Sequence, residues 1–253
     1  MRTLLNHPIM LFLASLAYLW LMTVLGNAIR VRRESFDEAR RSDYDLLVGA
    51  TLTLLSLIVG FSFSMAASRY DLRKNYEEAE ANAIGTAYSR VSLLSAPDTT
   101  KLRALLREYT DLRIRFYKCT DIKAGRALDA PTLRTQEQLW ATVSSAASAA
   151  PSALSALAAA AINDAINSQG YAQAAGWNRI PLGAWVLLYV LGGVATMLIG
   201  FRFHTDSKRS LIRLVFPGLV ATAFFLIADI DCPQQGVIRI EPENLQALAA
   251  TLR

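Results

Sequence analysis

The sequence predicts an all-α membrane protein with four transmembrane helices in two hairpins and a helical extramembrane domain inserted between spans two and three. Three observations predict this fold class. Hydrophobic residues make up 53% of the 253 residues, a larger share than a soluble core of this length needs. Four charge-poor apolar runs are long enough to cross a bilayer. The polar segment between the second and third runs has helical rather than alternating periodicity.

The first two apolar runs predict a transmembrane hairpin within residues 1–67. Residues 9–29 carry no charge, and at 1.5 Å per residue a helix of this length crosses about 30 Å of hydrocarbon. A cleaved signal peptide is the alternative, but its apolar region is normally about 7 to 15 residues long and ends at a small-residue cleavage site, which this run lacks. The second run, residues 46–67, is also free of charge.

The third and fourth runs, residues 182–201 and 211–228, predict a second hairpin within residues 181–228. The fourth run carries Arg213 near its start. An arginine at a helix end can extend toward the head groups and avoid the cost of about 2.5 to 3.5 kcal/mol at the bilayer centre. Because the connections 30–45 and 202–210 are short, both hairpin loops are expected on one side of the membrane.

The middle segment, residues 68–180, is predicted to be a helical domain. Apolar residues at three- and four-residue steps predict a helix over residues 100–119: Leu102, Leu105, Leu106, Tyr109, Leu112 and Phe116. Gly125 and Pro131 favour a loop over residues 120–131. Helices are expected again over residues 132–148 and from Pro151 to Ala175. The alanine-rich run "SSAASAAPSALSALAAAA" is interpreted as a close-packed helix, with a low-complexity linker as the alternative.

The second span is expected to continue into the middle domain as one helix. No proline or turn cluster interrupts the chain between Phe61 and Val91, and good helix formers continue past residue 67. We therefore expect a continuous helix from residue 46 to about residue 94, half in lipid and half in solvent.

A stripe of small residues along the second span is the main functional candidate. At helical spacing it consists of Gly49, Thr53, Ser56, Gly60, Ser64 and Ala67. Small residues let helices approach closely in lipid, which is the structural interpretation. The functional interpretation is that the stripe lines a water-filled path in an oligomer, with a bulky side chain as a constriction. The pore-lining candidates are Thr53, Ser56, Leu57, Gly60, Phe61, Phe63 and Ser64.

The tail after the last span, residues 229–253, is predicted to be structured. Asp229 and Asp231 lie at the expected membrane edge, and Pro233 and Gly236 turn the chain. Residues 237–240 are expected to be extended and residues 242–248 helical. Carboxylates at membrane depth are functional candidates. Ion pairs with an arginine at the same interface are the favoured interpretation, and the candidate partners are Arg73 and Arg179.

No pattern in the sequence predicts an enzyme or a cofactor. Phosphate-binding glycine loops, HExxH and GxSxG are absent. Two cysteines, Cys119 and Cys232, and two histidines, His7 and His204, are too few and too scattered to predict a metal site or a disulfide framework. The net charge of +5 arises from basic residues beside apolar runs, which indicates a lipid bilayer rather than nucleic acid as the partner.

Three motifs carry a family resemblance. "SRYDLRKNYEEAEANAIGTAY" leaves the second span, "NRIP" enters the third, and "DIDCPQQGVIRI" leaves the fourth. Together they resemble a bacterial family of four-span membrane proteins labelled bestrophin-like, over about residues 40–250. The resemblance implies that Asp229, Asp231, Pro233 and Gly236 form a family signature.

This family is remotely similar to bestrophins, pentameric anion channels whose second helix lines the pore. The resemblance therefore implies a homo-oligomer, with five copies as in bestrophins, that conducts inorganic ions, anions above all, across a bacterial inner membrane. A non-conducting, membrane-anchored sensory or interaction protein is the alternative that the sequence leaves open.

Basic residues leave the orientation in the membrane open. Nine lie near the hairpin loops: Arg30, Arg32, Arg33, Arg40, Arg41, Arg202, Lys208, Arg209 and Arg213. Six lie near the opposite ends: Arg2, Arg69, Arg73, Lys74, Arg179 and Arg239. This bias weakly favours a periplasmic middle domain, whereas bestrophins have theirs in the cytosol. In an oxidising periplasm Cys119 and Cys232 could pair, which the sequence does not decide.

Overall fold

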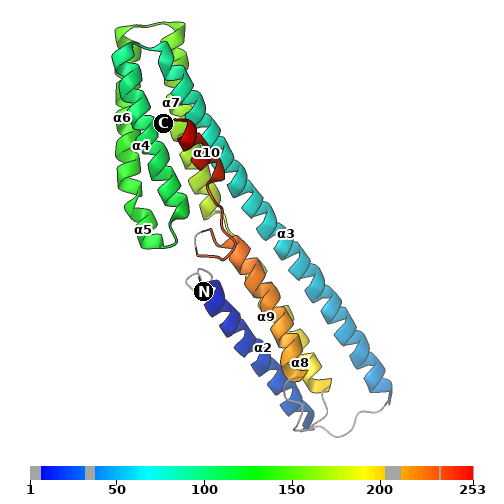
Figure 1. The fold of residues 1–253 in the computed structure, drawn as a ribbon. Helices are drawn as coiled ribbons and strands as arrows, with labels where there is room; N and C mark the ends of the chain where they lie inside the picture. The colour runs from blue at the N-terminus through cyan, green and yellow to red at the C-terminus, as the bar shows by residue number, and fades with distance from the viewer. Residues whose placement is uncertain (1–6, 32–37, 203–211, 234, 253) are drawn as a thin grey trace. The chain divides into compact units, whose positions relative to one another are not determined.

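A computed structural model describes residues 7–31, 38–202, 212–233 and 235–252 (Figure 1). Within these ranges the chain is helical and contains no strand. In chain order the elements are α2 (Pro8–Val31), α3 (Glu38–Arg90), the short 3-10 helix η1 (Val91–Leu93), α4 (Ala96–Lys118), α5 (Ile122–Ala127), α6 (Asp129–Ala149), α7 (Ala153–Trp177), α8 (Leu182–Arg202), α9 (Ile212–Asp231) and α10 (Glu243–Thr251).

Four helical stretches are long and apolar enough to cross a membrane: Pro8–Arg30, Ser42–Leu93, Ala153–Arg202 and Arg213–Asp231. They contain the four predicted spans except for the first two residues of the fourth: residue 212 precedes the stretch, and residue 211 lies outside the described residues. The all-α fold class with four apolar helices is therefore confirmed. The division into functional domains stays a prediction.

The chain forms two compact units. Unit 1 comprises Met1–Ser68 and Arg179–Ile238, and unit 2 comprises Arg69–Asn178 and Arg239–Arg253. In unit 1, α2 packs along both α8 and α9 (Figure 1). The first part of α3 also belongs to this unit.

Backbone contact between α2 and α8 holds much of unit 1 together. A methyl group added at Gly26 would collide with the carbonyl oxygen of Met197, and one added at Gly200 would collide with that of Thr23. The two helix backbones approach this closely because a glycine stands on one side of each contact. Such contacts replace the hydrophobic driving force, which lipid does not provide.

Aromatic side chains with hydroxyl groups fill the rest of this contact. The hydroxyl groups of Ser15 and Tyr189 lie 2.6 Å apart, and the Tyr18 hydroxyl donates to the Tyr189 carbonyl oxygen at 3.3 Å. Phe224 meets Tyr189 edge to face, with ring centroids 5.2 Å apart. Each polar tip is satisfied inside the unit, as a membrane interior requires.

The ends of three helices meet as two hairpins require. The Arg30 guanidinium, at the end of α2, donates to the Arg202 carbonyl oxygen at 2.9 Å. Arg202, at the end of α8, pairs with Asp45 of α3 at 2.6 Å. Of the basic residues counted for orientation, Arg2, Arg32, Arg33, Lys208 and Arg209 lie outside the described residues.

Helix α3 runs without a break for 53 residues. It passes Ala67 as regular helix and gives way to η1 only after Arg90. The predicted continuous helix is therefore confirmed, and its division between lipid and solvent stays a prediction. Continuity follows from the absence of proline and turn residues, since each residue adds a further hydrogen bond once a helix has formed.

Unit 2 encloses an apolar core made by the second part of α3 with α4, α6, α7 and α10. Leu102, Leu106 and Tyr109 of α4 are fully buried, as their spacing predicted. The alanine-rich run is packed helix rather than a linker: it forms the end of α6 and the start of α7, and Ala146 and Ala158 within it are buried.

The predicted loop over residues 120–131 is wrong, because α5 and the first turn of α6 occupy it. Asp121 begins α5, and its side chain accepts a hydrogen bond from the Lys123 backbone N–H at 3.1 Å. Pro131 lies in the first turn of α6, where a missing N–H costs no helical hydrogen bond.

The tail is structured, as expected, but not in the expected form throughout. Helix α10 follows Pro242, which confirms the short helix predicted there. The predicted extended run 237–240 is partly wrong, because residues 236–238 form bends.

Candidate functional site: an exposed helix stripe and an acidic turn

The stripe of small residues lies on the open side of α3. Gly49, Thr53, Ser56, Gly60 and Ser64 are exposed within the chain, and Ala67 is half-buried. Helical spacing sets the stripe opposite Leu55, Ser62 and Ala66, which are at most 4% exposed. In the most apolar stretch of α3 only 17% of the residues are buried, whereas in the most apolar stretch of α9 50% are buried.

Among the described residues, no helix packs on the stripe at its glycines. A methyl group added at Gly49 or Gly60 would find no described atom within 4 Å. This contrasts with Gly26 and Gly200, where the same addition would strike backbone. At these positions the described part of the chain does not cover the stripe, which leaves a second copy, lipid or water to do so.

Hydroxyl groups on the stripe bond to their own helix. The Thr53 hydroxyl donates to the Gly49 carbonyl oxygen at 2.9 Å, and the Ser56 hydroxyl donates to that of Thr53 at 2.9 Å. These bonds satisfy the hydroxyl protons and leave oxygen lone pairs on the exposed side of α3.

The bulky candidates lie beside the stripe rather than on it. Leu57, Phe61 and Phe63 are 49%, 61% and 41% exposed. At 3.6 residues per turn, Leu57 and Phe63 flank the centre of the stripe by about 60° on either side, whereas Phe61 lies about 100° away. Leu57 and Phe63 are thus better placed than Phe61 to narrow a path along the stripe.

At the end of α9, Asp231 holds the chain where it enters α8. Both of its carboxylate oxygens accept from the Ile180 backbone N–H, at 3.1 and 3.3 Å. The Arg179 guanidinium lies 3.5 Å from the same carboxylate. The structure thus brings Arg179 to Asp231, the type of pairing that the sequence favoured.

Asp229 holds the chain where it leaves unit 1. Its two carboxylate oxygens accept from the backbone N–H groups of Val237 at 2.7 Å and Ile238 at 2.8 Å. After the turn that contains Pro233, Gly236 passes so close that an added methyl group would lie 2.5 Å from the Asp229 carbonyl oxygen. Glycine is therefore required at this position.

The acidic turn is thus a pair of backbone anchors. Asp229 and Asp231 are 1% and 2% exposed, and each bonds backbone close to a boundary between the units. In the described ranges no three His, Cys, Asp or Glu side chains gather as metal ligands. The other candidate partner, Arg73, belongs to unit 2, where its Nε donates to the Arg69 carbonyl oxygen at 3.1 Å.

Cys119 and Cys232 are thiols in the structure rather than a disulfide. The Cys119 thiol donates to the Asp121 carbonyl oxygen at 3.2 Å.

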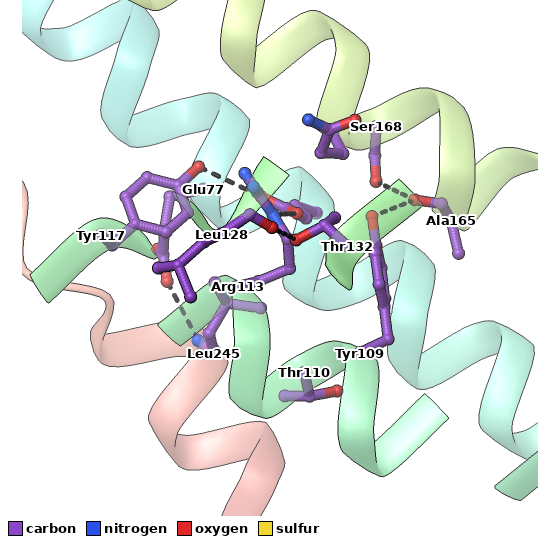
Figure 2. A network of polar contacts seen from close by, with 12 residues as sticks. Glu77, Tyr109, Thr110, Arg113, Tyr117, Leu128, Thr132, Ala165, Ser168 and Leu245 are labelled. Atoms are coloured by element: carbon purple, nitrogen blue, oxygen red, sulfur yellow. Dashed lines mark hydrogen bonds and ion pairs between the residues drawn. The ribbon is translucent and has the colours of Figure 1, made fainter. Parts of the chain in front are cut away.

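A buried ion pair in unit 2 escaped the sequence analysis. The Glu80 carboxylate pairs with the Arg113 guanidinium and accepts from the Tyr117 hydroxyl at 3.1 Å; Figure 2 shows Arg113 and Tyr117 from α4 at this cluster. The side chains of Arg113 and Glu80 are 2% and 0% exposed. Burial, reinforced by the charge of Glu80, raises the pKa of Tyr117.

Glu77, one turn before Glu80, binds the start of α10 (Figure 2). Its carboxylate accepts from the Leu245 backbone N–H at 3.0 Å and from the Asn244 side chain at 2.7 Å. The sequence signal was present: Glu77 and Glu80 fall on the same helical side as the buried Ile84. A carboxylate at a core position predicts a buried partner.

Comparisons with known proteins identify a family and similar solved structures. A family model described as "Bestrophin-like domain" matches residues 14–245. The crystal structure of a bacterial bestrophin homologue from Klebsiella pneumoniae, phased by Zn-SAD, matches with a TM-score of 0.64 and 14% identity over 95% of each chain. No curated protein matches significantly.

Two further crystal structures match. A point variant of a bacterial bestrophin homologue from Klebsiella pneumoniae gives a TM-score of 0.62 at 14% identity, covering 95% of this chain and 96% of that one. A structure described as a membrane protein gives 0.61 at 16% identity, covering 94% and 95%. At these identities the matches show a shared fold.

Proposed function

Because the chain belongs to the bestrophin-like family, whose members are known as ion channels rather than enzymes, we propose that it forms an oligomeric, anion-conducting channel with α3 of each copy lining the pore. The proposed site of action is the bacterial inner membrane, and the stoichiometry expected from the family resemblance is five copies. One observation carries the proposal: the exposed small-residue stripe of α3.

The composition of the stripe supports a pore or a copy-to-copy contact rather than a lipid contact. A lipid-facing side would carry large apolar residues, but this side carries Thr53, Ser56 and Ser64 between glycines. Hydroxyl oxygens suit an aqueous path. The glycines also allow neighbouring α3 helices to approach closely around an axis.

A constriction fits the bulky residues that flank the stripe. In a ring of α3 helices, Leu57 or Phe63 from each copy would project toward the axis beside the stripe. Apolar side chains that meet in a narrow pore control conduction by excluding water. Phe61, farther round the helix, would contribute less.

For the sign of the conducted ion, the family resemblance and the charges of this chain favour different answers. Residues 46–67 carry no charge, so no charged ring lies within the span. The next charges on the side of the stripe are Asp71, Lys74 and Glu78, all exposed, so that carboxylates outnumber the ammonium group two to one. Carboxylate rings favour cations, whereas the family resemblance favours anions.

A reversal potential in a KCl gradient decides between these ions. A potential near that of chloride supports anion conduction. A reversal potential near that of potassium indicates cation conduction, and the double variant Asp71→Asn with Glu78→Gln should then move it toward zero. That result changes the conducted ion in the proposal but keeps α3 as the pore-lining helix.

Flux through reconstituted protein tests the pore itself. The full-length protein in liposomes is expected to pass ions, and Phe63→Ala is expected to raise the flux severalfold, more than Phe61→Ala. Leu219→Ala is a matched control, because Leu219 is an exposed apolar residue of α9 (64% exposed). An intact oligomer without flux, or equal effects of all three variants, would contradict the proposal.

The alternative, a membrane-anchored sensory or interaction protein, has one observation in its favour. Unit 2 has a core of its own and a large helical surface. This function predicts a native mass of one or two copies, no flux, and a soluble partner that cross-links to unit 2. A native mass of several copies together with flux excludes it.

A further inference from the structure

Helix α7 has a second packing side that nothing in the described chain covers. Eight residues follow alternating three- and four-residue steps, and all are exposed: Ala153, Ala156, Ala160, Asn163, Asn167, Gly170, Ala174 and Trp177. We call this set the α7 seam. It lies opposite the buried residues Ala158 and Ala165. The spacing is that of a coiled-coil contact.

The composition of α7 is not that of a helix facing water. Its 25 residues include one charged residue, Asp164, whereas the 23 residues of α4, also half-exposed, include nine. The centres of protein interfaces are depleted of charge. Asn163, Asp164 and Asn167 on the exposed side argue against a lipid contact.

A groove of about 650 Å³ between α3 and α10 offers a complementary surface within unit 2. It is lined by small residues, among them Asn82, Gly85, Ser89, Ala247 and Thr251. Its only charged lining residue is Arg90. Along α3 the groove extends from Ala81 to Arg90, which is about three turns of helix.

The α7 seam and the groove lie at the same level along α3. Tyr76 of α3 stacks on Tyr171 of α7, with ring centroids 6.2 Å apart, and Arg69 bonds Asn178, so the two helices run antiparallel. Counting about 1.5 Å per residue from the tyrosine pair, Asn163 and Ala160 are level with about residues 84 and 87. In a closed ring with its axis along α3, contacting residues of neighbouring copies have similar heights.

We infer that the α7 seam of one copy docks into the α3–α10 groove of the next copy. The inference rests on the proposed oligomer and names the surface that closes its ring. Such a contact joins two different surfaces, as a ring with a central pore requires. Charge is favourable as well: Asp164 beside the seam and Arg90 at the end of the groove are opposite in sign and lie about seven residues, or roughly 10 Å, apart in height, a gap that the long arginine side chain partly spans. Neither is in an ion pair among the described residues.

Cross-linking between differently tagged copies tests the contact. In a background with Cys119 and Cys232 replaced by alanine, one copy carries Ala160→Cys and the other carries Ser89→Cys. The two are co-expressed in full-length form and treated with a short bis-maleimide in membranes. We expect product that carries both tags, at least tenfold more than from the pair Glu108→Cys with Ser89→Cys, since Glu108 is exposed on α4.

The outcomes separate this contact from the channel proposal. A conducting oligomer without the mixed product overturns the docking inference and leaves the channel intact. Mixed product in an oligomer without flux supports docking and overturns the channel. Cross-linking of the Ala160→Cys copies to one another overturns docking, as does quenching of a fluorophore at position 160 by brominated lipid.

A charge exchange is the second measurement. Asp164→Arg and Arg90→Glu are each expected to lower the oligomeric fraction in detergent by about threefold or more, and the double variant to restore it. Equal loss in the single and double variants would contradict pairing across the contact.

Discussion

Units 1 and 2 solve the same packing problem in different ways. In unit 1, helices meet where Gly26 and Gly200 remove side chains altogether. In unit 2, helices enclose an apolar core with the buried Glu80–Arg113 pair beside it. Water, the predicted surroundings of unit 2, drives apolar surface together. Lipid gives no such drive, so that unit 1 depends on close backbone contact.

The same difference between the units is seen along the single helix α3. Its packed side carries Ser62 and Ala66 in unit 1, and Arg73, Glu77 and Glu80 in unit 2. Steps of three, four and seven residues keep these positions on one side of the helix. The same side of α3 is therefore packed in both units, but the side chains on it are small in unit 1 and charged in unit 2. Four substitutions test this contrast, in order of expected effect.

The largest effect is expected from Glu80→Ala. It leaves the Arg113 guanidinium buried without its carboxylate, which costs about 3 to 5 kcal/mol in the free energy of unfolding. Denaturation of the purified protein, followed by circular dichroism, measures the loss. Glu78→Ala is the control, since Glu78 is exposed, and Glu80→Met with Arg113→Leu should recover most of the stability. A loss below about 1 kcal/mol would show that the pair does not anchor unit 2.

The second-largest loss of stability is expected from Asp229→Ala. Two backbone N–H groups lose a charged acceptor, and a hydrogen bond to a charged group contributes about 1.5 to 3 kcal/mol. We expect a loss of about 3 kcal/mol, with less from Asp229→Asn, which keeps one carbonyl oxygen. Limited proteolysis after Arg239 measures release of the tail. Cleavage equal to that of Glu241→Ala, a change at an exposed residue, would argue against anchoring.

Gly200→Ala should destabilise unit 1 by about 2 kcal/mol, a typical cost of overpacking. The added methyl group meets the Thr23 carbonyl oxygen, so that α2 and α8 must separate. Thermal unfolding in detergent gives the change, with Gly183→Ala on the same helix as the control because nothing lies within 4 Å of it. Equal melting temperatures for both variants would mean that α2 and α8 are not in contact at Gly200.

Gly60→Ala should have the smallest effect on stability, because the added methyl group meets no described atom. Within one chain it should be neutral or slightly favourable, since alanine is the better helix former by about 1 kcal/mol. Its effect should appear in the assembly instead, as a lower oligomeric mass or a changed flux. An unchanged mass and flux would indicate that the stripe faces lipid.

The spans were predictable because length and lack of charge suffice to identify them, and because hydrogen bonding in lipid leaves few alternatives to a helix. Helix α5 was not, since a six-residue helix depends on its Asp121 cap and on neighbours more than on its own pattern. The small-residue stripe was visible in the sequence. Its exposure was not, because whether Gly60 faces a neighbour depends on the tertiary arrangement.

The acidic turn illustrates the same limit. Sequence favoured an ion pair for Asp229 or Asp231, and Arg179 does lie beside Asp231. The backbone bonds of Asp231 could not be foreseen, since they link it to Ile180, 51 positions away. Those of Asp229 are more local, to Val237 and Ile238, 8 and 9 positions away, but they depend on the shape of the turn between. Glu77 and Glu80 lie in the part of the helix that was expected in solvent, although their spacing from Ile84 marks them as core positions.

The bond between Glu77 and Leu245 also bears on how the protein is made. The two residues are 168 positions apart, so that a ribosome adding about 5 to 20 residues per second needs roughly 10 to 30 s to supply the partner of Glu77. Until then this carboxylate lacks its partner, and the bundle of unit 2 cannot close around α10. Completion of unit 2 is thus a late event in biosynthesis, after all four spans have been translated.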